Sequence, residues 1–265
     1  MSYGGGYGGG GLRIGPAQTP AVIRDLIVVT GAALLLQWIL GFALPGGAGE
    51  PGAPPLPLVV EYGGLRPSLF FRGMVWQPLT TLFLHAEFMH FAGNMFFLWM
   101  FGSSVADALG RQRFLALYLG GGVAGGCLQL FLSLVLHLVG IESTLLPWEL
   151  PTIGASGAVF TVVAVYCFSW PDRTISLLFL PLSFTARWLL PIEFLMEFGF
   201  AWQAVSHAAH LCGVLVGWWW WKSGDLDRRI LQWMGRLRHA WSQRQAKHLK
   251  VVDRDRKDQD GPVFH

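Results

Sequence analysis

Six stretches of mainly apolar residues set the strongest limit on what this chain can fold into. About 20 apolar residues cross the hydrocarbon layer of a bilayer as one helix. On that measure the sequence predicts helices at about 22–44, 88–105, 114–138, 154–170, 186–202 and 207–221. The composition agrees, because 53% of the 265 residues are hydrophobic and 13% are charged, against roughly 25% charged in soluble domains. We therefore expect an all-α, polytopic membrane protein.

The remaining segments predict three parts and an orientation. Residues 1–20 are Gly-rich and expected to be disordered, 21–222 form the membrane domain, and 223–265 form a basic tail. Arg and Lys residues lie near every second connection between the predicted helices and near both ends of the membrane domain. The positive-inside rule places these connections and both termini in the cytoplasm. This charge pattern reports topology and not nucleic-acid binding. We expect a bacterial inner membrane, with the aromatic-rich loop 45–87 in its outer interface.

Two polar residues in the second apolar segment call for an explanation. Asn94 is the only asparagine in the chain, and an unpaired amide in hydrocarbon costs a few kcal/mol. His90 lies four residues earlier, so both side chains point to the same helix face. Hydrogen bonds between helices would explain the pair structurally. A role in chemistry is the other interpretation, because ionisable groups inside a membrane are often functional.

The fourth and sixth segments carry small residues that favour close packing. Gly213 and Gly217 form a GxxxG pair on the sixth segment, and His210 lies three residues before Gly213. The fourth segment begins with GASG, in which Ser156 is the third residue. Because small residues let helix backbones approach, we expect the His210 imidazole to reach the Ser156 hydroxyl.

The length of the fourth segment places this serine below the membrane surface. Ser156 to Trp170 is 15 residues, or about 22 Å of helix against a hydrocarbon layer of roughly 30 Å. Reaction with water at that depth requires a water-filled recess. His85, Glu87 and His90 are expected to line it.

Ser156 and His210 are residues of the types that acyl transfer requires. Neutral imidazole is the usual base for a serine nucleophile. The His90 ring, the Asn94 amide and the backbone N–H of Ser156 are suited to stabilise an oxyanion. Phe160 lies one turn after the serine and is a candidate to orient the histidine, with ordinary core packing as the alternative.

Three motifs in this order resemble the rhomboid intramembrane serine proteases. They are HxxxN at 90–94, GASG at 154–157 and AHxxGxxxG at 209–217, and the resemblance covers about residues 20–222. It implies a six-helix rhomboid-like bundle with a gated cavity open to the outside, a Ser156–His210 dyad, and oxyanion residues at His90 and Asn94. Supporting positions are expected at Gly154, Phe160, His85 and Gly213. The chain departs from the family pattern at Trp76-Gln77, where a Trp-Arg pair is common.

The predicted function is therefore hydrolysis of peptide bonds in or near transmembrane helices of membrane protein substrates. One alternative is a rhomboid-like protein that binds transmembrane helices without cutting them. Another is a transporter or metal site built from His85, Glu87, His90, His207 and His210. The HExxH zinc motif is missing, so we expect no metal and no cofactor. His207 is interpreted as a lining residue and 191–206 as a lateral gate, while the sequence leaves the oligomeric state open.

Overall fold

The computed structural model describes residues 16, 18–43, 56–176, 183–200, 205–224, 236 and 241–243. The chain divides into two compact units, Met1–Lys222 and Ser223–His265. Most of the Gly-rich residues 1–20 and of the basic residues 223–265 lie outside the described residues, so the predictions made for them stay predictions. The first unit contains all of the residues predicted to form the site.

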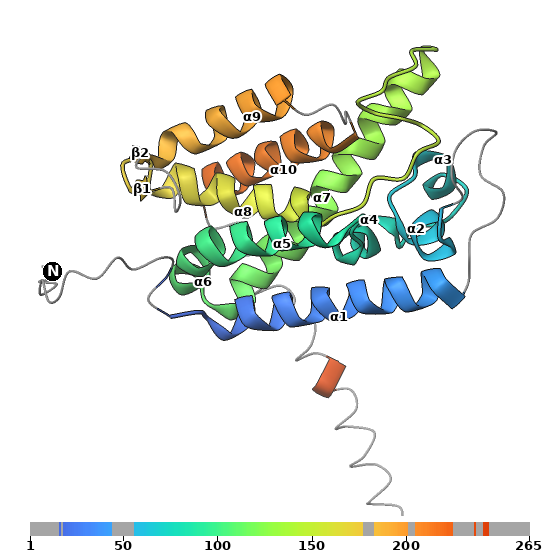
Figure 1. Cartoon of the computed structure of the whole chain (residues 1–265). Helices are drawn as coiled ribbons and strands as arrows, with labels where there is room; N and C mark the ends of the chain where they lie inside the picture. The colour runs from blue at the N-terminus through green and yellow to red at the C-terminus, as the bar shows by residue number, and fades with distance from the viewer. Residues whose placement is uncertain are drawn as a thin grey trace, which may run out of the picture. The chain divides into compact units, whose positions relative to one another are not determined.

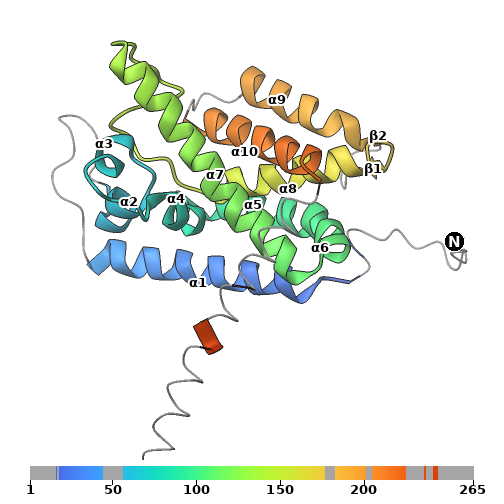
Figure 2. The same ribbon diagram turned by 180° about the vertical axis from the view of Figure 1, so that it is seen from behind.

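Helices dominate the first unit (Figure 1, and from behind in Figure 2). Each of the six predicted stretches overlaps an observed helix. In chain order the elements are α1 Ala21–Ala43, α2 Leu58–Gly63, α3 Pro67–Phe70, α4 Gln77–Thr80, η1 Thr81–Phe83, α5 Phe88–Phe97, η2 Leu98–Gly102, α6 Ser103–Leu109, α7 Arg111–Leu138, α8 Ser156–Ser169, β1 Thr174–Ser176, β2 Ser183–Thr185, η3 Ala186–Trp188, α9 Leu189–Phe200 and α10 Val205–Lys222.

Helix α8 lies at the centre of the bundle. It packs most extensively against α10 and α7, and it also contacts η2, α5, α6 and α9. Its side chains are buried from Ala158 to Cys167. A helix that is apolar all round is expected to be enclosed by others, and the segment from Ala158 to Cys167 has that pattern. The first residue of α8, Ser156, is therefore held by the best-packed element of the fold.

Helices α5, η2 and α6 follow one another without a break from Phe88 to Leu109. The middle segment, Leu98–Gly102, is a π-helical turn, and the flanking residues keep helical backbone angles. Such turns arise from a local change of hydrogen-bond register inside an α-helix. Hydrophobicity predicted a helix at 88–105, which ends four residues before Leu109, and gave no sign of this change.

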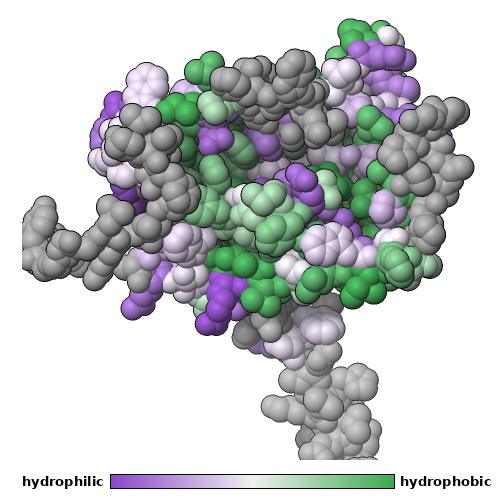
Figure 3. Space-filling view, viewed as in Figure 1, coloured by the Kyte–Doolittle hydropathy of each residue, from purple (hydrophilic) through white to green (hydrophobic). Residues whose placement is uncertain are grey.

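Two helices in the described part of the chain are long and apolar enough to cross a membrane, α1 and α7. Helix α8 is apolar but has 14 residues. The buried side of α1 includes Ile23, Leu26 and Leu34, while Leu36, Ile39 and Phe42 are exposed. Apolar side chains accordingly cover much of the visible surface over α1 (Figure 3). A helix whose exposed side is this apolar fits a lipid environment better than water.

The segment 56–83, part of the loop predicted at 45–87, folds into the short helices α2, α3, α4 and η1. These helices lie at one end of the unit, and the β1–β2 hairpin lies at the other (Figure 1). Leu65 pairs with Thr152 through two backbone hydrogen bonds of 2.8 and 2.9 Å. That pairing joins the short helices to the segment that leads into α8.

Candidate active site

Ser156 begins α8, and its side chain is buried. Gly154, two residues before it, has φ +132°, a backbone conformation that residues other than glycine rarely adopt. A Cβ at Gly154 would lie 2.7 Å from His90 Cε1 and 3.6 Å from Ser156 Oγ. Glycine therefore leaves the His90 ring and the serine hydroxyl on either side of the same small space.

Helix α10 approaches α8 backbone to backbone, as its GxxxG pair predicted. A Cβ at Gly213 would overlap the carbonyl oxygen of Gly157, and one at Gly217 would lie 2.6 Å from the carbonyl oxygen of Thr161. The Thr161 hydroxyl also lies 2.9 Å from the carbonyl oxygen of Gly157 and 3.1 Å from that of Gly213. This shared hydroxyl bridges the two helices directly below the serine.

His210 of α10 is half-buried, and its ring contacts α8. Its imidazole stacks on Phe160 with ring centroids 4.2 Å apart and planes 15° apart. Phe160 is four residues after the serine, and residues four apart share one helix face. The structure thus brings His210 and Phe160 together on the helix face that Phe160 shares with Ser156.

Asn94 is buried, and its amide donates a 3.0 Å hydrogen bond to the backbone carbonyl of His90. In this arrangement the amide is used within its own helix. Of the two predicted oxyanion side chains, His90 is the one that lies across the Gly154 space from Ser156. Asn94 lies one helical turn after His90 and supports the His90 backbone through this hydrogen bond.

His85 is fully buried and contacts both the segment before Ser156 and the His90 ring. The Ala155 N–H points to its Nε2 at 3.5 Å, and its ring meets that of His90 edge to face at 5.0 Å. Burial, together with nearby His90, lowers the pKa of His85 to about 4, while an interaction with the Phe83 backbone acts in the opposite direction. The ring is therefore neutral at pH 7 and can accept a hydrogen bond.

Gln37 is a supporting residue that the sequence analysis missed. Its amide forms two hydrogen bonds with the backbone of His85, of 2.7 Å to the carbonyl oxygen and 3.0 Å from the N–H. It lies inside α1, within a long apolar stretch. The signal that singled out Asn94, an amide among apolar residues, could have found Gln37 as well.

His207 is buried one turn before His210 in α10. Within the described residues, no group of three or more His, Cys, Asp or Glu side chains could hold a metal ion. Part of the predicted gate, including Trp202 and the side chains of Phe198 and Phe200, lies outside the described residues.

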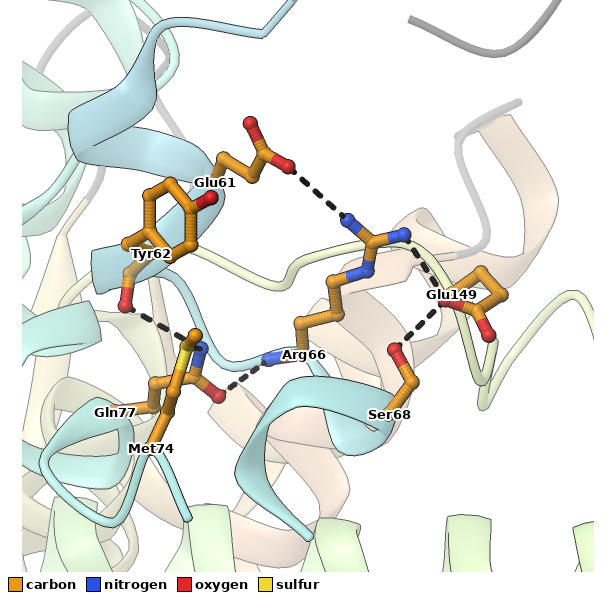
Figure 4. Close-up of polar contacts among 7 residues, drawn as sticks. All are labelled: Glu61, Tyr62, Arg66, Ser68, Met74, Gln77 and Glu149. Atoms are coloured by element: carbon orange, nitrogen blue, oxygen red, sulfur yellow. Dashed lines mark hydrogen bonds and ion pairs between the residues drawn. The ribbon is translucent and has the colours of Figure 1, made fainter. Parts of the chain in front are cut away.

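Gln77, the departure from the family pattern, is fully buried in the short-helix segment. Its oxygen accepts a 3.1 Å hydrogen bond from the Arg66 N–H, and its nitrogen lies 3.3 Å from the carbonyl oxygen of Tyr62 (Figure 4). Gln77 therefore joins α4 to the end of α2 and to the chain between α2 and α3 by hydrogen bonds.

Comparison with known proteins identifies the class of the chain. A family model described as "Rhomboid domain" matches residues 72–222. Presenilin-associated rhomboid-like protein, mitochondrial, from Bos taurus is 36% identical over 146 residues, which are 54% of this chain and 36% of the relative. Rhomboid protein 1, mitochondrial, from Saccharomyces cerevisiae is 33% identical, over 59% of this chain and 45% of the relative. Rhomboid protease GluP from Bacillus subtilis is 27% identical, over 69% and 32%.

These relatives correct the predicted location, and each is matched over less than half of its own length. The bovine and yeast relatives are named as mitochondrial proteins, so the predicted location in a bacterial inner membrane is wrong. The match spans about a third of the length of the bovine relative, and the activity of that whole protein is not transferred by it. The family model covers more than half of the chain, and the chain therefore belongs to the rhomboid family.

Proposed function

We propose that this protein is an intramembrane serine endopeptidase that cuts membrane protein substrates in or near their transmembrane helices. The observation that carries the proposal is the convergence of three side chains on the start of α8. Ser156 begins the helix, His90 lies across the Gly154 space from it, and His210 stacks on Phe160 of the same helix face. The name of the Bacillus subtilis relative, a rhomboid protease, supports the same activity.

In the proposed reaction His210 takes the proton of the Ser156 hydroxyl as its Oγ attacks the carbonyl carbon of the scissile bond. The backbone N–H of Ser156, near the positive end of α8, and the His90 ring stabilise the oxyanion, with Asn94 as a further donor. His210 then gives the proton to the leaving amine. Water, with His210 again as base, hydrolyses the acyl-enzyme and regenerates the serine.

The proposal includes six membrane spans in a mitochondrial membrane. The spans would be α1, the continuous helix α5–η2–α6, α7, α8, α9 and α10. A water-filled recess would admit the substrate to Ser156, and 191–206 would form a lateral gate. The mitochondrial names of the bovine and yeast relatives support this location.

Cleavage of a reporter with one transmembrane helix by the purified protein in detergent tests the function. Ser156→Ala and His210→Ala are each expected to reduce the rate at least about a thousandfold, because both groups act in one step. Ser169→Ala is a matched control, since Ser169 is an exposed serine at the other end of α8. Full cleavage by Ser156→Ala would refute the proposal.

The alternative is a rhomboid-like protein that captures transmembrane helices without cutting them. A fluorophosphonate probe separates the two, because it reacts with an activated serine. The protease is expected to be labelled at Ser156 and to lose labelling when His210 is replaced by Ala. Reporter binding with neither labelling nor cleavage would favour the capture function.

A further inference from the structure

The segment that leads into Ser156 is held along one edge by residues 56–83, which contain the short helices and are called the short-helix segment. Leu65 and Thr152 exchange two backbone hydrogen bonds, and the Ser68 N–H donates to the Trp148 carbonyl oxygen at 3.2 Å. Residues 65–68 and 148–152 therefore run antiparallel. The chain continues from Thr152 through Gly154 to the serine, so this edge lies four residues from the proposed nucleophile.

An ion pair lies within this edge. Arg66 Nη2 is 2.9 Å from Glu149 Oε2, and the Ser68 hydroxyl donates a 2.7 Å hydrogen bond to the same oxygen (Figure 4). The other Arg66 terminal nitrogen lies 3.8 Å from Glu61. Figure 4 shows the Arg66 side chain extended between these two carboxylates. The backbone of Arg66 is itself held by buried Gln77, so the guanidinium projects from a fixed base.

Trp148, the neighbour of Glu149, is held by two aromatic contacts. Its ring is nearly parallel to that of Phe71, with centroids 5.7 Å apart, and to that of His137 at the end of α7, at 3.9 Å. The ion pair and the stacked rings thus fix adjacent residues of the same segment. They attach it both to the short helices and to α7.

The fixed segment passes its position on to the site through hydrogen bonds. The Thr81 hydroxyl donates a 2.6 Å bond to the Thr152 carbonyl oxygen, and the Thr81 carbonyl accepts a 3.1 Å bond from the Gly154 N–H. Gln129 of α7 donates a 2.8 Å bond to the Thr152 hydroxyl. A shift of the segment at Glu149 would therefore reach Gly154, which lies between the His90 ring and the Ser156 hydroxyl.

We propose that Arg66 and Glu149 are positioning residues that hold the 148–155 segment so that Ser156 and the His90 ring keep their relative geometry. This inference rests on the proposed protease function. Glu149 is exposed and Arg66 is partly buried, and an ion pair with an exposed partner contributes modestly to overall stability. A displacement of about 1 Å in an active site can nevertheless cost about a hundredfold in rate. The pair is thus expected to act on turnover more than on folding.

Kinetics of reporter cleavage with Arg66→Gln, Glu149→Gln and the double variant test the role. Each single change is expected to lower kcat about tenfold with KM changed less than twofold, and the double variant is expected to be no slower than either. The charge exchange Arg66→Glu with Glu149→Arg should recover part of kcat. Unchanged kcat in both single variants, or strictly multiplicative losses in the double variant, would overturn the proposal.

The chain offers a matched control ion pair. Arg187 and Asp172 pair at the opposite end of the unit, beside the β1–β2 hairpin, and both are exposed. Arg187→Gln and Asp172→Asn are expected to leave kcat and KM unchanged. Thermal unfolding of all variants in detergent should give Tm values close to that of the native protein, so that lost turnover is not lost folding.

Hydrogen exchange of the amides at 152–156 gives a readout that does not depend on activity. Glu149→Gln is expected to speed exchange of these amides severalfold and to leave those of α10 unchanged. Unchanged exchange at 152–156 would overturn the positioning role even if the native protein cleaves the reporter. Faster exchange in a protein that never cleaves would support the fixed segment and refute the protease function instead.

Discussion

At the scale of single residues, His85 shows how burial sets the chemistry of a side chain. The imidazole is fully enclosed, and this burial lowers its pKa from the ordinary 6.5 to about 4. A charged ring would lose its hydration, and it could no longer accept the hydrogen bond from the Ala155 N–H. The native fold therefore favours the neutral form of His85.

This preference predicts a pH-dependent stability. The unfolded chain binds a proton at His85 near pH 6.5 and the folded chain only near pH 4. The His85 contribution is thus complete above about pH 6.5, and it is lost as the pH falls towards 4, by at most about 3 kcal/mol. The Tm of His85→Gln measured in detergent from pH 4 to 8 should fall less steeply than that of the native protein. Parallel curves would contradict this.

Residue patterns predicted the close approach of α8 and α10 better than the contacts that support the site. Asn94 and His90 stood out because polar groups in apolar segments need partners, and the glycines around Ser156 and His210 predicted close approach. The Gln37 amide could have been singled out in the same way, but its partner is a backbone 48 residues away, and no local pattern identifies that partner. The same limit applies to Gln129, whose partner Thr152 lies 23 residues further along the chain.

At the scale of elements, the contact between α8 and α10 depends on Gly213. A Cβ there would overlap the Gly157 carbonyl oxygen, so Gly213→Ala would force the two helices apart. We expect a lower Tm and at least about a tenfold loss of reporter cleavage, because His210 would move away from Ser156.

Gly120 in α7 is the matched control for this substitution. A Cβ at Gly120 would meet no atom within 4 Å, and alanine favours helix by up to about 1 kcal/mol over glycine. Gly120→Ala should therefore keep both Tm and cleavage at or above native values. Equal losses in the two variants would show that glycine flexibility, and not close packing, matters at Gly213.

The positions of the long helices could be predicted from hydrophobicity, whereas the irregular elements could not. Apolar length located each of the long helices that make up the bundle, because burial or lipid contact requires it. Apolar length gave no sign of the β1–β2 hairpin or of the π-helical turn, and the short helices α2 to α4 are held by contacts with a distant segment. The pairing of Leu65 with Thr152 is one example.

At the scale of the whole molecule, an exposed side chain can contact either lipid or water. Leu36 on α1 is 55% exposed, and the surface around it is apolar. Glu142, between α7 and α8, is also exposed. If α1 crosses the membrane, Leu36 contacts lipid and Glu142 contacts water. Leu34, two residues from Leu36, is buried in the bundle and should contact neither.

Spin labels on single cysteines at these three positions measure the difference in reconstituted vesicles. The native Cys127, Cys167 and Cys212 are first replaced by alanine. The label at Leu36→Cys should collide often with oxygen, which partitions into lipid, and rarely with a water-soluble nickel chelate. Glu142→Cys should show the reverse, and Leu34→Cys should be protected from both, because packed side chains exclude each reagent. Frequent nickel collisions at position 36 would mean that α1 faces water and does not cross the bilayer.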